Sequence, residues 1–188
     1  KGVRLLGPNC IGVIHTHTGF TLTVNAVIDT DEPQCGNYAL ISQSGSMLGS
    51  LMTRGQNRGI RFSSLISVGN ECDLDLADMV SACASQSQTK AIALFIETIR
   101  QPERFREAVA YAIHSNKPVA AYLVGRSKLG SKLAQSHTGA MLGSGEALRA
   151  FLDDCGVVRV HQFETLIEIA PMLKAYQCTS KLAAKPKK

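Results

Sequence analysis

The sequence has few aromatic residues, no long apolar run and no basic stripe, and each absence argues against a class of protein. Aromatic residues make up only 5% of the chain, and none is interleaved with clustered lysine and arginine as in nucleic-acid-binding domains. The net charge of +5 comes largely from four lysines in the last eight residues, so the rest of the chain is close to neutral. No apolar run is long enough to cross a bilayer. We therefore expect neither a nucleic-acid partner nor a membrane.

The cysteines form no recognisable framework. Six of them are scattered along the chain without a Cys-x-x-Cys pair or a Cys/His cluster at metal-ligand spacing. His15 and His17 are expected on one side of an extended segment and could together bind a metal. No third ligand accompanies them, so we favour surface positions for both and predict no metal site. The sequence also lacks a charged start, apolar centre and cleavage site of the secretory kind. We expect a reducing, cytoplasmic compartment.

Short apolar runs alternate with helical patterns over most of the chain. The predicted strands are 38–41, 60–68, 91–96, 118–124 and 157–160, and the predicted helices are 47–58, 76–85, 102–115, 146–155 and 163–176. Runs such as 91–96 are apolar throughout, which is typical of strands buried on both faces. The alternation predicts an α/β fold, a doubly wound parallel sheet of five strands with helices on both faces, flavodoxin-like in its arrangement.

Composition divides the chain into three parts. Residues 1–35 contain a strand broken by Gly7-Pro8-Asn9-Cys10 and an acidic, turn-rich linker, and we expect them to end a preceding domain. Residues 36–176 form the predicted flavodoxin-like domain, and the basic residues 177–188 form a tail that we expect to be disordered. The chain begins within a predicted strand, so we expect it to be part of a longer protein.

Polar and glycine-containing segments follow four of the predicted strands. They are 42–46, Gly69-Asn70, Glu97 and the loop that carries His137. Ligands of open α/β sheets bind beyond the carboxyl ends of the strands, where the strand order reverses. We therefore expect these segments to converge on one ligand site.

The segment Ser136-His137-Thr138-Gly139-Ala140 places a histidine before a run that can open a helix. Its lead-in, 125–132, is polar, basic and glycine-containing, which predicts an exposed loop. Backbone N–H groups at a helix start bind anions, and a neutral imidazole is a competent nucleophile near pH 7. His137 is thus a candidate phosphoryl carrier. The alternative is an exposed loop histidine whose neighbours Ser136 or Thr138 only cap a helix.

Two other segments carry groups that could act with His137. Residues 42–46, Ser-Gln-Ser-Gly-Ser, join a strand to a helix and could present free N–H groups to an anion, or could be an ordinary helix cap. Glu97 ends an apolar strand, and its carboxylate could accept a hydrogen bond from the imidazole and so fix the tautomer. Glu97 could equally cap the next helix or pair with Arg100.

A serine hydrolase is a weaker alternative. Ser44, Asp73 or Asp75, and His137 occur in the chain order of α/β-hydrolases. The Gly-x-Ser-x-Gly elbow is missing, however, because Ser42 stands where its first glycine belongs. The 42–46 segment also lacks the lysine of a P-loop.

Taken together, these segments resemble the nucleotide-diphosphate-forming acyl-CoA synthetases, which are relatives of the succinyl-CoA synthetase α subunit and include ADP-forming acetyl-CoA synthetases. The matching motifs run in family order to about Leu173: Gly7-Pro8-Asn9-Cys10-x-Gly12, Ser42-Gln43-Ser44-Gly45, Gly69-Asn70-x-x-Asp73-x-Asp75, Glu97, Lys117-Pro118, Gly125-Arg126-Ser127 and Ser136-His137-Thr138-Gly139-Ala140. Any one motif is weak, but the ordered set is specific.

The resemblance implies an acid–thiol ligase in which His137 is phosphorylated during turnover and Glu97 hydrogen-bonds it. It implies a phosphate-binding set of Ser42, Gln43, Ser44, Gly45, Ser46, Thr138 and Gly139. It also implies that four residues lie near CoA and the acyl group: Asn9, Cys10, Gly69 and Asn70. The phosphoryl group would pass between an acyl phosphate and ADP or ATP.

The resemblance further implies cofactors and partners. CoA, and ATP or ADP with Mg²⁺, would be bound mainly by a CoA-binding domain and an ATP-grasp domain or subunit, and residues 1–35 would include the end of the former. A small carboxylic acid or its acyl-CoA would be the substrate, the protein would form homo- or hetero-oligomers, and the chain alone would be inactive. The alternative is a ligand-sensing, regulatory domain such as those fused to acetyltransferases. Their histidine motif is typically degenerate, so the intact Ser-His-Thr-Gly-Ala favours the enzyme.

Overall fold

The computed structural model describes residues 2–24, 33–124, 145–173 and 175. The described strands are β1 (Gly12–His15), β2 (Phe20–Thr23), β3 (Cys35–Ser42), β4 (Phe62–Ser67), β5 (Ala91–Ile96), β6 (Val119–Leu123) and β7 (Val158–Val160). The described helices are α1 (Gly45–Asn57), α2 (Leu76–Ser85), α3 (Pro102–His114), α5 (Gly145–Asp154) and α6 (Thr165–Glu168). The loop carrying His137 and the tail 177–188 lie outside the described residues.

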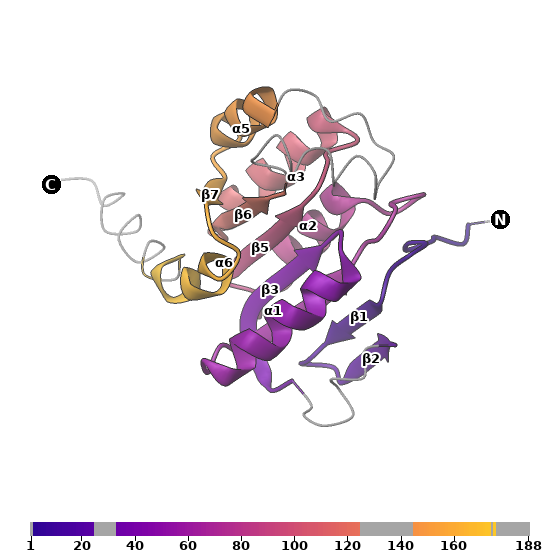
Figure 1. Ribbon diagram of the computed structural model, residues 1–188. Helices are drawn as coiled ribbons and strands as arrows, with labels where there is room; N and C mark the ends of the chain where they lie inside the picture. Colours follow the sequence, from indigo (N-terminus) through magenta and orange to yellow (C-terminus); the bar gives the residue numbers. More distant parts are fainter. Residues whose placement is uncertain (1, 25–32, 125–144, 174, 176–188) are drawn as a thin grey trace, which may run out of the picture.

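All described strands belong to one sheet, in the order β2-β1-β4-β3-β5-β6-β7 (Figure 1). The five strands from β4 to β7 are parallel, which confirms the predicted flavodoxin-like α/β arrangement. The sheet is larger than predicted, because β1 pairs antiparallel with β4 and β2 pairs antiparallel with β1. Residues expected to end a preceding domain thus extend this sheet by a hairpin.

Helices cover both faces of the sheet, as the alternating pattern predicts. Buried side chains of α1 and α6 form one core with alternate residues of the strands, and those of α2, α3 and α5 form a second core with the residues between them. All six residues of β5 are buried, with Leu94 facing one core and Phe95 the other. This two-sided burial explains why the strand is apolar throughout.

The predicted limits of α2 and β5 agree with the structure, and most other limits differ by one or two residues. The α2 helix begins sharply because Asp75 and Asp78 form a capping box, in which each carboxylate accepts a hydrogen bond from the other residue's backbone N–H. The last predicted helix, 163–176, is wrong in extent: α6 ends at Glu168, and residues 170–173 form a separate helical stretch.

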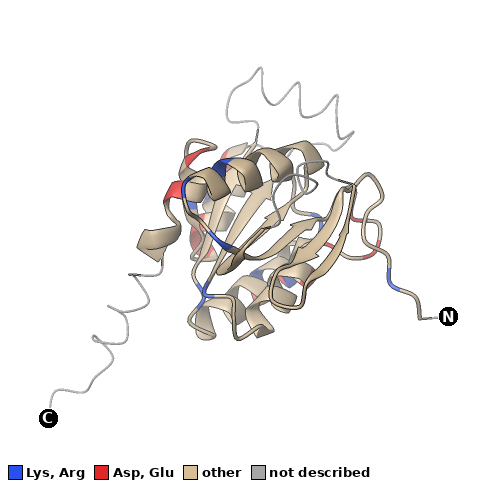
Figure 2. Cartoon of the chain, turned by 90° about the horizontal axis from the view of Figure 1, so that it is seen from below, with Lys and Arg blue, Asp and Glu red and all other residues tan. Residues whose placement is uncertain are grey.

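Figure 2 shows acidic and basic residues interspersed along the described chain. Several form bridges between elements, such as Arg106 of α3 with Asp154 of α5, whose nitrogen and oxygen lie 2.6 Å apart. None of the described helices is both long and apolar enough to span a membrane.

The order of the strands fixes where a ligand can bind. The chain passes from β3 to β4 through α1 on one face and from β4 to β5 through α2 on the other, so strand order reverses at β3. The carboxyl ends of these three parallel strands meet at one edge of the sheet. Ligand sites of open α/β sheets form at such a switch point.

Candidate functional site

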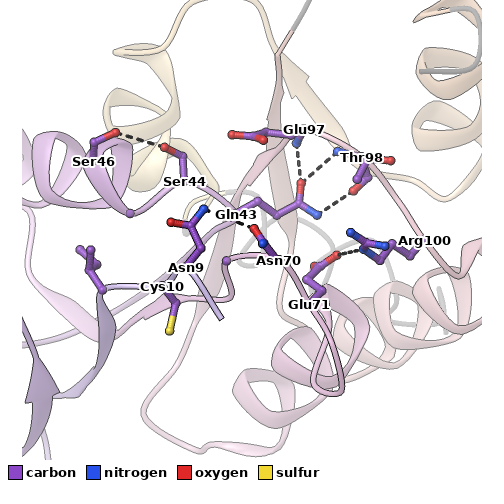
Figure 3. A pocket seen from close by; sticks show the side chains of 13 residues that line it. Asn9, Cys10, Gln43, Ser44, Ser46, Asn70, Glu71, Glu97, Thr98 and Arg100 are labelled. Carbon is purple, nitrogen blue, oxygen red and sulfur yellow. Dashed lines mark hydrogen bonds and ion pairs between the residues drawn. The ribbon is translucent and has the colours of Figure 1, made fainter. Parts of the chain in front are cut away.

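A cavity of about 340 Å³ opens at the switch point, beyond the carboxyl ends of β3, β4 and β5 (Figure 3). Nine of the predicted site residues line it: Asn9, Cys10, Gln43, Ser44, Gly45, Ser46, Gly69, Asn70 and Glu97. The remaining lining residues are Ile11, Glu71, Thr98 and Arg100. The structure thus brings together segments that are far apart in the sequence.

The amino terminus of α1 faces this cavity. Ser44 is the N-cap residue with extended backbone, and its carbonyl oxygen accepts the first helical hydrogen bond from Leu48 N–H at 3.1 Å. The Ser44 side chain caps no backbone N–H among the described residues, and its Oγ instead lies 3.3 Å from Ser46 Oγ. The first turn also has no acidic residue. The N–H groups of this turn therefore lie at the cavity without a capping side chain from Ser44, as at helix starts that bind anions.

Gly45 allows the helix start to lie against the amino-terminal segment. A Cβ atom at Gly45 would lie 2.5 Å from Cγ2 of Ile11, which is too close for any larger residue. Ile11 follows Asn9 and Cys10, so this contact holds both residues beside the helix start. Packing against Ile11 thus requires glycine at position 45.

Ser42 lies behind the cavity lining. Its side chain is fully buried. The Ser42 Oγ atom donates a hydrogen bond to Ser44 O at 2.6 Å and accepts one from Ser44 N–H at 3.1 Å. The hydroxyl therefore stabilises the turn between β3 and α1.

Gln43 joins the end of β3 to the end of β5. Its Oε1 accepts hydrogen bonds from the N–H groups of Glu97, at 2.6 Å, and Thr98, at 3.0 Å. Its Nε2 donates to Thr98 O at 2.8 Å (Figure 3). The Gln43 side chain is therefore committed to the backbone that follows β5.

Asn9 and Asn70 meet across the cavity wall. The Asn9 Nδ2 group donates to Asn70 Oδ1 at 3.3 Å, and Asn70 N–H donates to Pro8 O at 2.8 Å. Gly69 has a φ of +59°, and a Cβ there would lie 2.2 Å from Pro8 O. This close approach explains the Gly69-Asn70 pair: glycine admits the amino-terminal segment, and the two amides then line the cavity.

Glu71 and Arg100 also line the cavity but were not predicted as site residues. The Glu71 side chain is only 2% exposed, and its Oε2 lies 3.6 Å from Arg100 Nε. Burial raises the pKa of Glu71 to about 7, although hydrogen bonds from Gln43 and from Leu76 N–H lower it. Glu71 could have been identified from the sequence, because it directly follows Gly69-Asn70 at the end of a predicted strand.

Glu97 lies at the rim of the cavity, at the exit of β5 (Figure 3). Arg100, one of the partners considered for it, forms its ion pair with Glu71 instead. The chain leaving β6 toward the histidine loop starts beside it, because Val124 N–H donates to Ile96 O at 2.9 Å. His137, Thr138 and Gly139 lie outside the described residues, so the contact between His137 and Glu97 stays a prediction.

The other titratable groups considered from the sequence have local partners. His15 Nδ1 lies 2.9 Å from Thr18 Oγ1, and His17 Nε2 lies 2.6 Å from the carbonyl oxygen of Gly36. Within the described ranges, no three His, Cys, Asp or Glu side chains are grouped so that they could hold a metal ion.

The geometry gives the serine-hydrolase alternative no support. Asp73 accepts hydrogen bonds from Arg4 and from the N–H of Leu5, and the Arg4 guanidinium lowers the pKa of that carboxyl. Asp75 caps α2. Neither carboxylate is directed at Ser44, because both are committed to structural contacts outside the cavity.

A sequence model of the succinyl-CoA ligase-like flavodoxin domain matches residues 35–173. The chain belongs to this family. The match includes the switch-point segments from β3, β4 and β5 as well as the His137 motif.

Relatives of this flavodoxin-like domain occur in ADP-forming acyl-CoA ligases. The chain is 38% identical over 169 residues to the α subunit of acetate–CoA ligase [ADP-forming] II of Pyrococcus furiosus, a match that covers 90% of this chain and 36% of that protein. It is 32% identical over 169 residues to 4-hydroxybutyrate–CoA ligase [ADP-forming] of Nitrosopumilus maritimus, covering 89% of this chain and 24% of that protein.

A solved structure shows the same fold. The dinucleotide-forming acetyl-coenzyme A synthetase 1 of Ca. Korarchaeum cryptofilum, in complex with phosphate and ADP, matches with a TM-score of 0.84 and 28% identity. The match covers 92% of this chain and 37% of that one. The chain therefore corresponds to one domain of such synthetases and spans between 24% and 37% of the lengths of these three relatives.

Proposed function

We propose that this domain carries the phosphoryl relay of an ADP-forming acyl-CoA synthetase, with His137 as the phosphoryl carrier and Glu97 as its hydrogen-bond partner. The observation that carries the proposal is the cavity at the switch point, which is lined by both Glu97 and the amino terminus of α1. The histidine loop leaves β6 beside Ile96, the residue before Glu97. A nucleophile, a group that orients it and an anion-binding helix start are the parts that such a relay needs.

The proposed chemistry runs through an acyl phosphate. Inorganic phosphate attacks the thioester of an acyl-CoA, the carbon–sulfur bond breaks, and CoA leaves as the thiol. One imidazole nitrogen of His137 then attacks phosphorus, the bond between phosphorus and the acyl oxygen breaks, and the acid leaves as its carboxylate. Transfer from the phosphohistidine to ADP forms ATP and restores the imidazole, and every step is reversible.

Each group of the cavity has a role in this scheme. The Glu97 carboxylate accepts the N–H of the imidazole nitrogen that does not attack, which fixes the tautomer. The N–H groups at Ser44, Gly45 and Ser46, with Thr138 and Gly139, bind the phosphoryl oxygens. Asn9, Cys10, Gly69 and Asn70 contact the acyl end of CoA at the opposite wall.

We propose that CoA and the Mg²⁺-nucleotide are held mainly by a CoA-binding domain and an ATP-grasp domain or subunit. Residues 1–35 would end the first of these, residues 36–176 would form the relay domain, and residues 177–188 would be a tail. The short coverage of the relatives supports this division, and the Pyrococcus furiosus relative is itself a subunit. We also propose a cytoplasmic location, which the free thiols of the cysteines among the described residues support.

The net reaction tests the proposal. The assembled synthetase, meaning this chain together with its CoA-binding and ATP-grasp parts, should form acyl-CoA, ADP and phosphate from a small acid, CoA and Mg²⁺-ATP. His137→Ala should abolish the reaction, whereas His114→Ala, on the exposed side of α3, should leave it unchanged. An assembly that binds acyl-CoA tightly without turnover would instead identify a ligand-sensing domain.

A further inference from the structure

The Gln43 side chain links two of the loops that line the cavity at the switch point. It is 8% exposed and belongs to the turn after β3, while its hydrogen-bond partners belong to the segment after β5. Its carboxamide hydrogen-bonds the backbone of both Glu97 and Thr98.

The bonds continue the β3–β5 pairing beyond the end of the strands. Ser42 lies opposite Phe95 in the register, and Gln43 N–H donates to Phe95 O at 3.2 Å. Beyond this point, the Gln43 carboxamide supplies the hydrogen bonds that the backbone of a neighbouring strand would otherwise supply. Its oxygen accepts from the N–H groups of Glu97 and Thr98, and its nitrogen donates to Thr98 O. The backbone of Glu97 is thereby fixed on both sides of its α-carbon.

The pairing needs a side chain with an acceptor and a donor at one end. A carboxamide provides both, and the length of glutamine matches the gap between the two turns. The bonds are short, at 2.6, 3.0 and 2.8 Å, and the group is almost completely removed from solvent. Loss of the carboxamide would leave two N–H groups and one carbonyl without their partner, and the peptide between Glu97 and Thr98 would be able to rotate.

We infer that Gln43 is a positioning residue that holds the backbone of Glu97 so that its carboxylate can orient the phosphoryl-accepting imidazole. The inference rests on the proposed function, and it assigns to the Gln43 side chain a role different from direct phosphate binding. The chemistry needs reacting groups to be placed within a fraction of an ångström, so a small rotation at Glu97 should slow phosphoryl transfer without weakening substrate binding.

Two substitutions test the inference in the assembled synthetase. Gln43→Met keeps the length of the side chain but removes donor and acceptor, and it should lower the rate of His137 phosphorylation by roughly 10- to 100-fold with little change in the KM for phosphate. The matched control is Gln86→Met, at the opposite edge of the sheet, whose Oε1 accepts from Ser64 and Thr89 hydroxyls at 3.1 and 3.0 Å. The control should phosphorylate at the wild-type rate.

Gln43→Glu provides a rescue that a merely structural role would not give. A protonated glutamic acid has one acceptor and one donor in the geometry of glutamine, whereas its ionised form cannot donate to Thr98 O and repels Glu71 and Glu97, with Arg100 as the nearby cation. The rate of this variant relative to wild type should therefore rise as pH is lowered from about 8 to about 6. Gln43→Met should show no such rise.

Hydrogen exchange supplies a readout that does not depend on activity. The peptide containing Glu97 and Thr98 should exchange faster in Gln43→Met than in wild type or Gln86→Met. Unchanged exchange, or an unchanged phosphorylation rate in Gln43→Met, would overturn the inference alone. A wild-type protein that is never phosphorylated would instead overturn the proposed function and, with it, the role assigned to Gln43.

Discussion

Glu71→Gln is expected to stabilise the protein at neutral and alkaline pH, although it removes an ion pair. The Glu71 carboxylate is 2% exposed and faces Gln43, Asp75 and Arg100. Burial is the largest cause of its raised pKa, and the guanidinium at 3.6 Å offsets only part of it. Glutamine keeps an oxygen that can accept from Leu76 N–H and carries no charge that must be buried.

The size of the effect follows from the two pKa values. The pKa of Glu71 is about 7 in the folded protein and 4.5 as the ordinary value, a difference worth roughly 3 kcal/mol. Because the folded state holds the proton more tightly, the wild-type protein is most stable below the ordinary pKa and loses this contribution as pH rises toward 7. Asp73 and Asp153 have lowered pKa values, so the stability that they contribute is lost only as pH falls below their ordinary pKa of 3.8, outside this window.

Urea unfolding at a series of pH values between about 4 and 8 measures the effect. The difference in unfolding free energy between Glu71→Gln and wild type should be near zero at the acid end and reach up to roughly 3 kcal/mol in favour of the variant at the alkaline end. Glu107→Gln, on the exposed side of α3, should show no such pH dependence. A Glu71→Gln difference that does not change with pH would refute the reasoning.

Three further substitutions test other parts of the structure. Glu97→Gln should lower the rate of His137 phosphorylation by about 100-fold or more, measured by rapid quench, because an amide orients the imidazole less strongly than a carboxylate. Lys117→Met should reduce the unfolding free energy in urea by about 2–3 kcal/mol, because the buried Lys117 ammonium donates to three carbonyls at the end of α2. Gly69→Ala should cost about 2 kcal/mol or more and expose the amino-terminal segment to proteolysis, because its Cβ would lie 2.2 Å from Pro8 O at a φ of +59°.

The parallel part of the fold could be predicted because its signals are local. The strand β5 is apolar throughout, and the start of α2 is set by the Asp75 and Asp78 carboxylates, so both elements have the predicted limits. The hairpin of β1 and β2 could not be predicted in the same way. Its strands have four residues each, β2 is mostly exposed, and the pairing with β4 is set by contacts distant in sequence.

The site could be predicted only as far as the strand ends. Residues that follow parallel strands must meet at one edge, and this rule is sufficient to bring Asn70 and Glu97 to the same cavity. The hydrogen-bond partners and the burial of individual side chains depend on strand register and on loop conformation. The bonds of Gln43 follow from the pairing of Ser42 with Phe95, and the burial of Glu71 follows from a turn in which that residue itself has a φ of +54°. Neither is visible in the pattern of residue types.

Detection of phosphohistidine tests the central claim most directly. The assembled synthetase is incubated with Mg²⁺ and ATP labelled in its γ-phosphate, and the protein is isolated and digested. We expect an acid-labile, base-stable label on the peptide containing His137, absent from His137→Ala and discharged by a small acid together with CoA. A synthetase that turns over without labelling this peptide, or that is labelled equally in His137→Ala, would contradict that claim.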